Sequence, residues 1–134
     1  MDNCIFCKIV KGECPCYKVY EDEFTLAFLD ISKDVYGHTL VIPKKHVENV
    51  LDCDNQTLNY VINTVKKVSN HYVNNCGFKG VNILNASGAE AQQSVFHLHF
   101  HLIPRENKND CDAFPKLPGT NVDFSVQLER LKVK

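Results

Sequence analysis

The sequence predicts an α+β domain with a mainly antiparallel sheet, and two observations predict it. Short strand-like runs lie on both sides of one long segment with helical periodicity. The runs do not alternate regularly with helices, which argues against repeated parallel β–α–β units. A length of 134 residues is typical of one domain with one core. We therefore expect a single domain over residues 1–134, with residues 104–134 forming a C-terminal loop and a short helix.

The first half of the chain carries the short elements. Residues 4–10 are an apolar segment that favours one or two helical turns. Strand-like runs follow at residues 17–20 and 24–30, separated by an acidic turn. A third run, residues 39–42, ends at Pro43, which cannot donate a hydrogen bond to a sheet ladder.

The period changes over residues 54–76, which we expect to form one long amphipathic helix. Its apolar residues recur at three- and four-residue spacing, at Leu58, Val61, Ile62, Val65, Val68 and Tyr72. Asp54 is suited to cap this helix and Gly77 to stop it. Strands are expected again at residues 80–85 and 95–103, and a final helix at residues 123–132.

Composition excludes several classes of protein. With 15 basic and 16 acidic residues the formal charge is −1, which argues against general binding of nucleic acid or anionic lipid. No run approaches the ~18 apolar residues of a membrane span. Seven cysteines without a visible secretory signal indicate a reducing compartment, so we expect a cytoplasmic protein.

The last expected strand carries the strongest functional signal. Side chains alternate between the two faces of a strand, so three histidines share one face and four apolar residues the other, which we expect to be a core face. The histidines are His97, His99 and His101, and the apolar residues are Phe96, Leu98, Phe100 and Leu102. Three titratable groups backed by an apolar stripe indicate a functional face.

A metal site is one use of these side chains. Neighbouring histidines on a strand are ~6.6 Å apart at the backbone, so all three cannot easily reach one zinc ion. Cys4 and Cys7 have C-x-x-C spacing, which suits either two thiolate ligands of one ion or a redox pair. His46 and His97 would complete a Cys2His2 set if the fold brings them close.

Residues 93–101, Gln-Ser-Val-Phe-His-Leu-His-Phe-His, resemble the signature of the histidine triad (HIT) family of nucleotide hydrolases and transferases. Residues 4–10, 26–31 and 37–46 resemble further segments of that family, and residues 103–105 continue the signature. The likeness is strongest to its bacterial Hint-like branch. It implies a HIT-like fold and a structural zinc ion held by Cys4, Cys7, His46 and His97.

The resemblance also implies the chemistry. His99 would attack the α-phosphorus of a nucleotide, while His101 and Ser94 would lie against the phosphate oxygens; no cofactor is needed for this step. Asp30 would accept hydrogen bonds from the ribose. The implied nucleotide-binding residues are Asp30, Ile5, Phe6, Ile9, Phe28, Asn85, Gln93, Ser94, His99 and His101. His38 and His71 are interpreted as structural.

Two positions depart from the family pattern. The family usually has glycine directly before Gln93, where this chain has Gln92. The family's polar residue seven positions before Gln93 falls on Ala86, with Asn85 one place away. These departures affect the expected phosphate loop and leave the nucleophile unchanged.

We therefore expect a hydrolase or nucleotidyl transferase acting on a nucleoside 5'-phosphoramidate or a dinucleoside polyphosphate, with a purine nucleotide as substrate or product. It would be a homodimer, with neither nucleic acid nor a membrane as partner. Two alternatives remain at this point. One is a nucleotide-binding regulatory module with negligible turnover. The other is a metal-dependent enzyme or redox protein that uses the histidine strand with Cys4 and Cys7.

Overall fold

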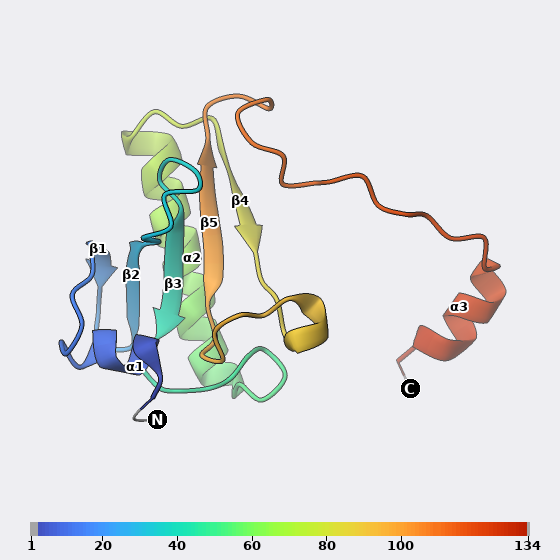
Figure 1. Cartoon of the computed structure of the whole chain (residues 1–134), viewed down its shortest axis with the longest axis horizontal. Helices are drawn as coiled ribbons and strands as arrows, with labels where there is room; N and C mark the ends of the chain where they lie inside the picture. Colours follow the sequence, from blue (N-terminus) through green and yellow to red (C-terminus); the bar gives the residue numbers. More distant parts are fainter. Residues whose placement is uncertain (1–2, 134) are drawn as a thin grey trace.

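The computed structural model describes residues 3–133, so the predicted domain limits at residues 1 and 134 lie outside it. A five-stranded antiparallel sheet with the order β1-β2-β3-β5-β4 forms its centre (Figure 1). The strands are β1 (Lys18–Glu21), β2 (Thr25–Leu29), β3 (Thr39–Pro43), β4 (Gly80–Leu84) and β5 (Phe100–Arg105). The helices are α1 (Ile5–Val10), α2 (Asn55–Asn75) and α3 (Phe124–Leu131), with a 3-10 turn at Ala89–Ala91. The predicted α+β class with a mainly antiparallel sheet is confirmed.

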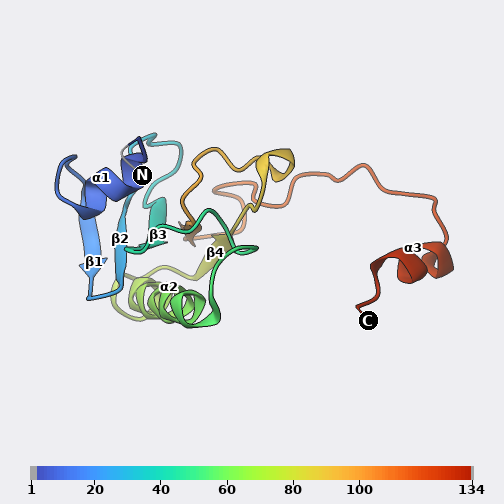
Figure 2. The ribbon, with the colours of Figure 1, turned by 90° about the horizontal axis from the view of Figure 1, so that it is seen from below.

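The two faces of the sheet are covered by different helices, α1 on one side and α2 on the other (Figure 2). Alternation along each strand divides the apolar side chains between two cores. The larger core lies against α2 and includes Ala27, Val41, Phe100, Leu102, Val61 and Val65. The smaller core lies against α1 and consists of Phe6, Leu26, Phe28, Leu40 and Ile42. Every second residue of β5 therefore lies on the face of the sheet that carries α1.

Helix α2 has the predicted caps. The Asp54 carboxylate accepts a hydrogen bond from the Thr57 N–H, and Gly77 follows the helix with a φ of +83°. Four of the six residues of the apolar repeat are buried, and Leu58 is half-buried. Ile62 is 44% exposed, because it follows Val61 by about 100° around the helix and points away from the sheet.

The predicted last strand, residues 95–103, is wrong at both ends, whereas the other elements agree within one residue. Strand β5 begins only at Phe100, where Val41 of β3 is its partner. Continuing this register would bring Leu98 opposite Pro43, which has no N–H to donate. The segment before Phe100 therefore leaves the ladder, and the Leu98 N–H donates instead to the Val47 carbonyl. Phe96, predicted to be a core residue, is 43% exposed.

The chain after β5 extends away from the sheet and ends in α3, which lies apart from the other elements (Figures 1 and 2). Phe124, Leu128 and Leu131 share one face of α3 and are all exposed. Within residues 3–133, no helix combines the length and the hydropathy that crossing a bilayer would require.

Candidate metal centre and active site

The three histidines lie on the α1 side of the sheet. Phe100 and Leu102 point into the α2 core, so His101 between them points towards the opposite face. His97 and His99 precede the strand and are both buried. The Phe6 ring of α1 packs edge-on against both, with ring centroids 5.8 Å from His97 and 5.3 Å from His99.

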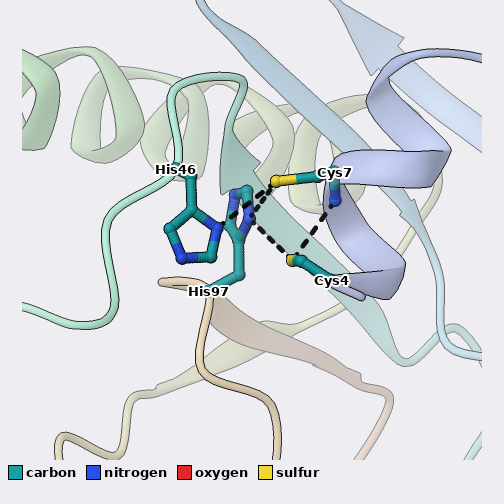
Figure 3. Close-up of side chains that lie close together, drawn as sticks. All are labelled: Cys4, Cys7, His46 and His97. Atoms are coloured by element: carbon teal, nitrogen blue, oxygen red, sulfur yellow. Dashed lines mark hydrogen bonds between the residues drawn. The ribbon is translucent and has the colours of Figure 1, made fainter. Parts of the chain in front are cut away.

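The four predicted metal ligands converge on one point, although they come from three parts of the chain (Figure 3). Cys4 caps α1 and Cys7 lies in its first turn, because C-x-x-C spacing spans one helical turn. His46 follows β3, and His97 precedes β5. The Cys7 Sγ is 3.3 Å from the His46 Nδ1 and 3.6 Å from the His97 Nδ1, while the Cys4 Sγ is 3.4 Å from that same nitrogen.

These distances fit a tetrahedral zinc ion. With Zn–S bonds of about 2.3 Å and Zn–N bonds of about 2.0–2.1 Å, tetrahedral geometry separates sulfur and nitrogen ligands by about 3.5 Å. The observed range of 3.3–3.6 Å brackets this value. Cys4, Cys7, His46 and His97 are therefore a Cys2His2 set suited to zinc.

The ring orientation of His97 supports the same assignment. Its Nε2 is 2.8 Å from the Pro43 carbonyl oxygen, which can only accept, so Nε2 carries the proton. The Nδ1 lone pair then faces the two cysteine sulfurs. Burial lowers the pKa of His97 to about 4, which keeps the ring neutral, as a metal ligand must be. A second hydrogen bond that fixes the tautomer is the usual arrangement for a ligating histidine.

The His99 ring is held by its own backbone. Its Nδ1 lies 2.8 Å from the His97 carbonyl oxygen and must donate the hydrogen bond, which leaves the lone pair on Nε2. Burial lowers the pKa of His99, so the imidazole stays neutral. A neutral, oriented imidazole with a lone pair on Nε2 is equipped for nucleophilic attack.

His101 has a partner that the sequence interpretation missed. Its Nδ1 is 2.9 Å from the Nε2 of His38, a residue interpreted above as structural. The strands pair Leu40 with His101, so His38, two residues from Leu40, lies on the same face. Gly37 allows this approach: its φ is +77°, and a Cβ there would lie 2.6 Å from the Pro104 ring. The sequence does show a histidine, His38, directly before β3. Its contact with His101 could not be predicted, because it depends on the register between β3 and β5.

The predicted ribose ligand Asp30 lies close to this pair. Its Oδ1 accepts a hydrogen bond from the Ser32 N–H, and its Oδ2 is 3.7 Å from the His38 Nδ1. Asp30 and His38 also line a cavity of about 820 Å³, which His99 does not line. Asp30 is thus available to a ligand beside His38.

The four apolar residues among the predicted nucleotide-binding residues differ in their exposure to solvent. Phe6 and Phe28 are 6% and 3% exposed and pack edge-on against each other, so they are mainly core residues. Ile9 is half-buried against the same cluster. Ile5 is 45% exposed and lines a groove of about 470 Å³ with Ser94, Cys4 and His46. This groove places Ser94 beside the metal ligands.

The Gln93 side chain holds the expected phosphate loop in place through hydrogen bonds. Its side-chain oxygen accepts from the Asn49 amide and the Gly88 N–H, and its nitrogen donates to two backbone carbonyls. A direct nucleotide contact by this amide would require these bonds to be exchanged. Asn85 donates to the His99 carbonyl, which fixes the backbone of the candidate nucleophile. Gln92 has a φ of +70°, the backbone region that glycine adopts most easily.

Comparison with known proteins agrees with this arrangement. A family model described as "HIT domain" matches residues 11–108. An uncharacterized HIT-like protein of Borreliella burgdorferi is 48% identical over 95% of this chain and 91% of its own. An adenosine 5'-monophosphoramidase of Schizosaccharomyces pombe is 42% identical, covering 79% of this chain and 77% of its own.

Solved structures show the same fold. A crystal structure of a HIT family member from Bacillus subtilis has a TM-score of 0.81 and 42% identity, covering 98% of this chain and 99% of that one. A zinc-bound histidine triad protein from Mycobacterium smegmatis has a TM-score of 0.77 and 35% identity, covering 88% and 85%. Its sequence and its fold both match proteins of this family, so the chain belongs to the HIT domain family.

Proposed function

We propose that this protein hydrolyses the α-phosphate bond of a nucleoside 5'-phosphoramidate or a dinucleoside polyphosphate, through a covalent nucleotidyl-His99 intermediate. One observation carries the proposal. The His97 carbonyl holds the His99 Nδ1–H at 2.8 Å, so the neutral ring keeps its lone pair on Nε2. The S. pombe relative is named as an adenosine 5'-monophosphoramidase, which supports a purine nucleotide as substrate or product.

The reaction has two displacements. In the first, the Nε2 lone pair of His99 forms a bond to the α-phosphorus, and the bond from phosphorus to the amine or phosphate breaks. The leaving group keeps the bonding electron pair, and an amine takes up a proton from solvent. In the second, water forms a bond to phosphorus and releases a proton to solvent, while the N–P bond breaks. Its electron pair returns to Nε2, and a nucleoside monophosphate leaves.

Other residues of the chain orient the nucleotide. The His101 ring lies beside His99, with ring centroids 5.0 Å apart, so it would lie against the phosphate oxygens and donate to them when protonated on Nε2. Asp30 would accept hydrogen bonds from the ribose hydroxyls, with its position held by the Ser32 N–H. Ser94 is proposed as a further donor to phosphate, and Ile5, Phe6, Ile9 and Phe28 as the apolar side of the base site.

We propose a structural role for zinc. Metal ligation would join α1 to the segments after β3 and before β5. The ligands would be Cys4, Cys7, His46 and His97. When bound, the ion supplies a crosslink between these segments and no reaction chemistry. Since His97 provides the carbonyl that orients His99, zinc at this site would hold the nucleophile indirectly.

The test is turnover of adenosine 5'-phosphoramidate with release of AMP. The wild-type protein should turn over, and His99→Ala should reduce kcat by at least about 10³-fold, because it removes the nucleophile. His71→Ala, on the exposed surface of α2, is the matched control and should stay active. Brief treatment with a chelator should leave activity above the His99→Ala level. Activity that follows metal occupancy and survives His99→Ala would contradict the proposal, as would AMP binding without turnover.

We also propose a homodimer whose sheet continues through the edge strand β4. The opposite edge strand, β1, is short and carries Lys18 and Glu21, charges that discourage edge pairing. Strand β4 instead exposes Ile83, and the C-terminal segment leaves the body on its side (Figure 1). The seven free thiols of the chain suit the reducing cytoplasm, where we place the protein.

A further inference from the structure

Three ionisable side chains form a continuous hydrogen-bonded series that reaches the active site. The Asp34 Oδ1 is 2.8 Å from the His38 Nδ1, and the His38 Nε2 is 2.9 Å from the His101 Nδ1. Asp34 lies in the connection between β2 and β3, with its side chain 58% exposed. His38 is buried, with 8% of its side chain exposed. The series therefore runs from solvent to the candidate phosphate site.

The charge of the Asp34 carboxylate determines which ring nitrogens of His38 and His101 carry a proton. An ionised carboxylate can only accept, so the His38 Nδ1 must carry a proton and donate it to Asp34. The neutral His38 ring then has its lone pair on Nε2 and accepts a hydrogen bond from the His101 Nδ1–H. The hydrogen bond from His38 also lowers the pKa of Asp34, which keeps the carboxylate ionised.

This arrangement matters for the other nitrogen of His101. With a proton fixed on Nδ1, neutral His101 has a lone pair on Nε2 and would meet a phosphate oxygen with an acceptor. To donate there, His101 must carry a second proton. Burial opposes this and lowers the pKa of His101 to about 4 in the free protein, with His99 and His38 adding to the effect. A bound phosphate and the carboxylates of Asp30 and Asp34 act in the opposite direction.

We propose that Asp34 is a positioning residue for the reaction, which acts through His38 to keep His101 protonated on Nε2 against the nucleotide phosphate. The inference rests on the proposed function, because it assigns His101 to the phosphate. Asp34 is better placed than Asp30 to accept the hydrogen bond from the His38 Nδ1–H. The nearest oxygen of Asp30 is 3.7 Å from that nitrogen, and its other oxygen accepts from the Ser32 N–H. Lys33 and Glu106 are further charged residues that line the cavity beside His38.

The test compares wild-type protein with Asp34→Asn, which keeps an oxygen acceptor but removes the charge. Removing a negative charge lowers the pKa of His101 in the nucleotide complex, so the proton on Nε2 is lost at lower pH. The alkaline limb of the kcat profile should therefore move down by about 0.5–1 pH unit, and kcat should fall about threefold to tenfold at pH 8. At pH 6 the kcat values of the two proteins should differ less than at pH 8. High salt should reduce the difference, because Asp34 is largely exposed.

Two further variants separate this role from general effects. Glu23→Gln removes an exposed carboxylate outside the site and should leave the profile unchanged. In a His38→Gln background, Asp34→Asn should have no further effect on the alkaline limb, because the connection to His101 is already broken. An equal shift in that background, or an unshifted limb in Asp34→Asn alone, would overturn the proposal.

An NMR measurement keeps the inference distinct from the proposed function. Ring ¹⁵N shifts with AMP bound should show His38 protonated on Nδ1 and a higher pKa of His101 in wild type than in Asp34→Asn. These shifts do not depend on turnover. If wild-type protein showed these shifts but failed to cleave adenosine 5'-phosphoramidate, the proposed function would fall, whereas the proton arrangement from Asp34 through His38 to His101 would stand. A His38 ring protonated on Nε2 would overturn the positioning role.

Discussion

Three histidines at alternate positions differ in chemistry because each has a different hydrogen-bond partner. His97 donates from Nε2 to the Pro43 carbonyl and turns Nδ1 towards two sulfurs. His99 donates from Nδ1 to the His97 carbonyl and keeps its Nε2 lone pair. His101 has an imidazole partner, His38, in place of a carbonyl. The tautomer of each ring, and hence its chemistry, follows from these partners.

The metal centre gives a prediction at this scale. Cys4→Ser replaces a soft thiolate with a hydroxyl, so zinc affinity should fall by at least about 100-fold, and the zinc content and Tm of the purified protein should fall with it. Metal analysis and thermal unfolding measure both effects. Cys76→Ser, at an exposed thiol outside the cluster, is the matched control and should keep full zinc content. Equal zinc content in the two variants would exclude the proposed ligand set.

Gln92 gives a second prediction at the residue scale. A left-handed backbone conformation is least favourable for a β-branched residue, so Gln92→Val should lower the free energy of unfolding by about 1–2 kcal/mol. Gln92→Gly should leave it unchanged or raise it by up to about 1 kcal/mol, because glycine relieves the strain but loses more entropy on folding. Urea unfolding of the three proteins measures the difference. Equal destabilisation by valine and glycine would show that the φ of +70° is not what matters at this position.

At the scale of elements, the sequence predicted those whose signals are local. Helix α2 combines a 3.6-residue period, an aspartate cap and a glycine stop, and all three are present in the structure. The start of β5 could not be predicted in the same way. It depends on the register with β3, which would bring Leu98 opposite Pro43, 55 residues earlier in the chain. Alternation alone therefore extended the strand too far and placed Phe96 in the core.

The candidate site shows the same division. Cys4, Cys7, His46 and His97 were named from spacing and resemblance, and the structure brings them together. Asp34 and His38 were missed as site residues because their contacts with each other and with His101 depend on the turn at Gly37 and the pairing of β3 with β5. A residue whose role depends on a partner 63 positions away carries no local pattern.

At the scale of the whole molecule, the open edge of β4 gives a prediction. Light scattering of the wild-type protein should give twice the mass of the 15.2 kDa chain. Ile83→Lys places a charge at the proposed interface and should shift the population towards monomer. Leu51→Lys makes the same kind of change at an exposed loop residue and should remain dimeric. A monomeric wild type, or equal behaviour of the two variants, would contradict the proposed dimer.

Periodicity along the chain predicted the class of fold and the order of the elements, and the resemblance to the HIT family named the candidate metal ligands and the candidate nucleophile. Periods and motifs are properties of short stretches of sequence, so they can be recognised before the chain folds. Only the tertiary structure decided which histidine nitrogen is free, where β5 begins, and that Asp34 and His38 reach His101. Those properties depend on hydrogen bonds between distant segments, and strand register sets these bonds when the chain folds.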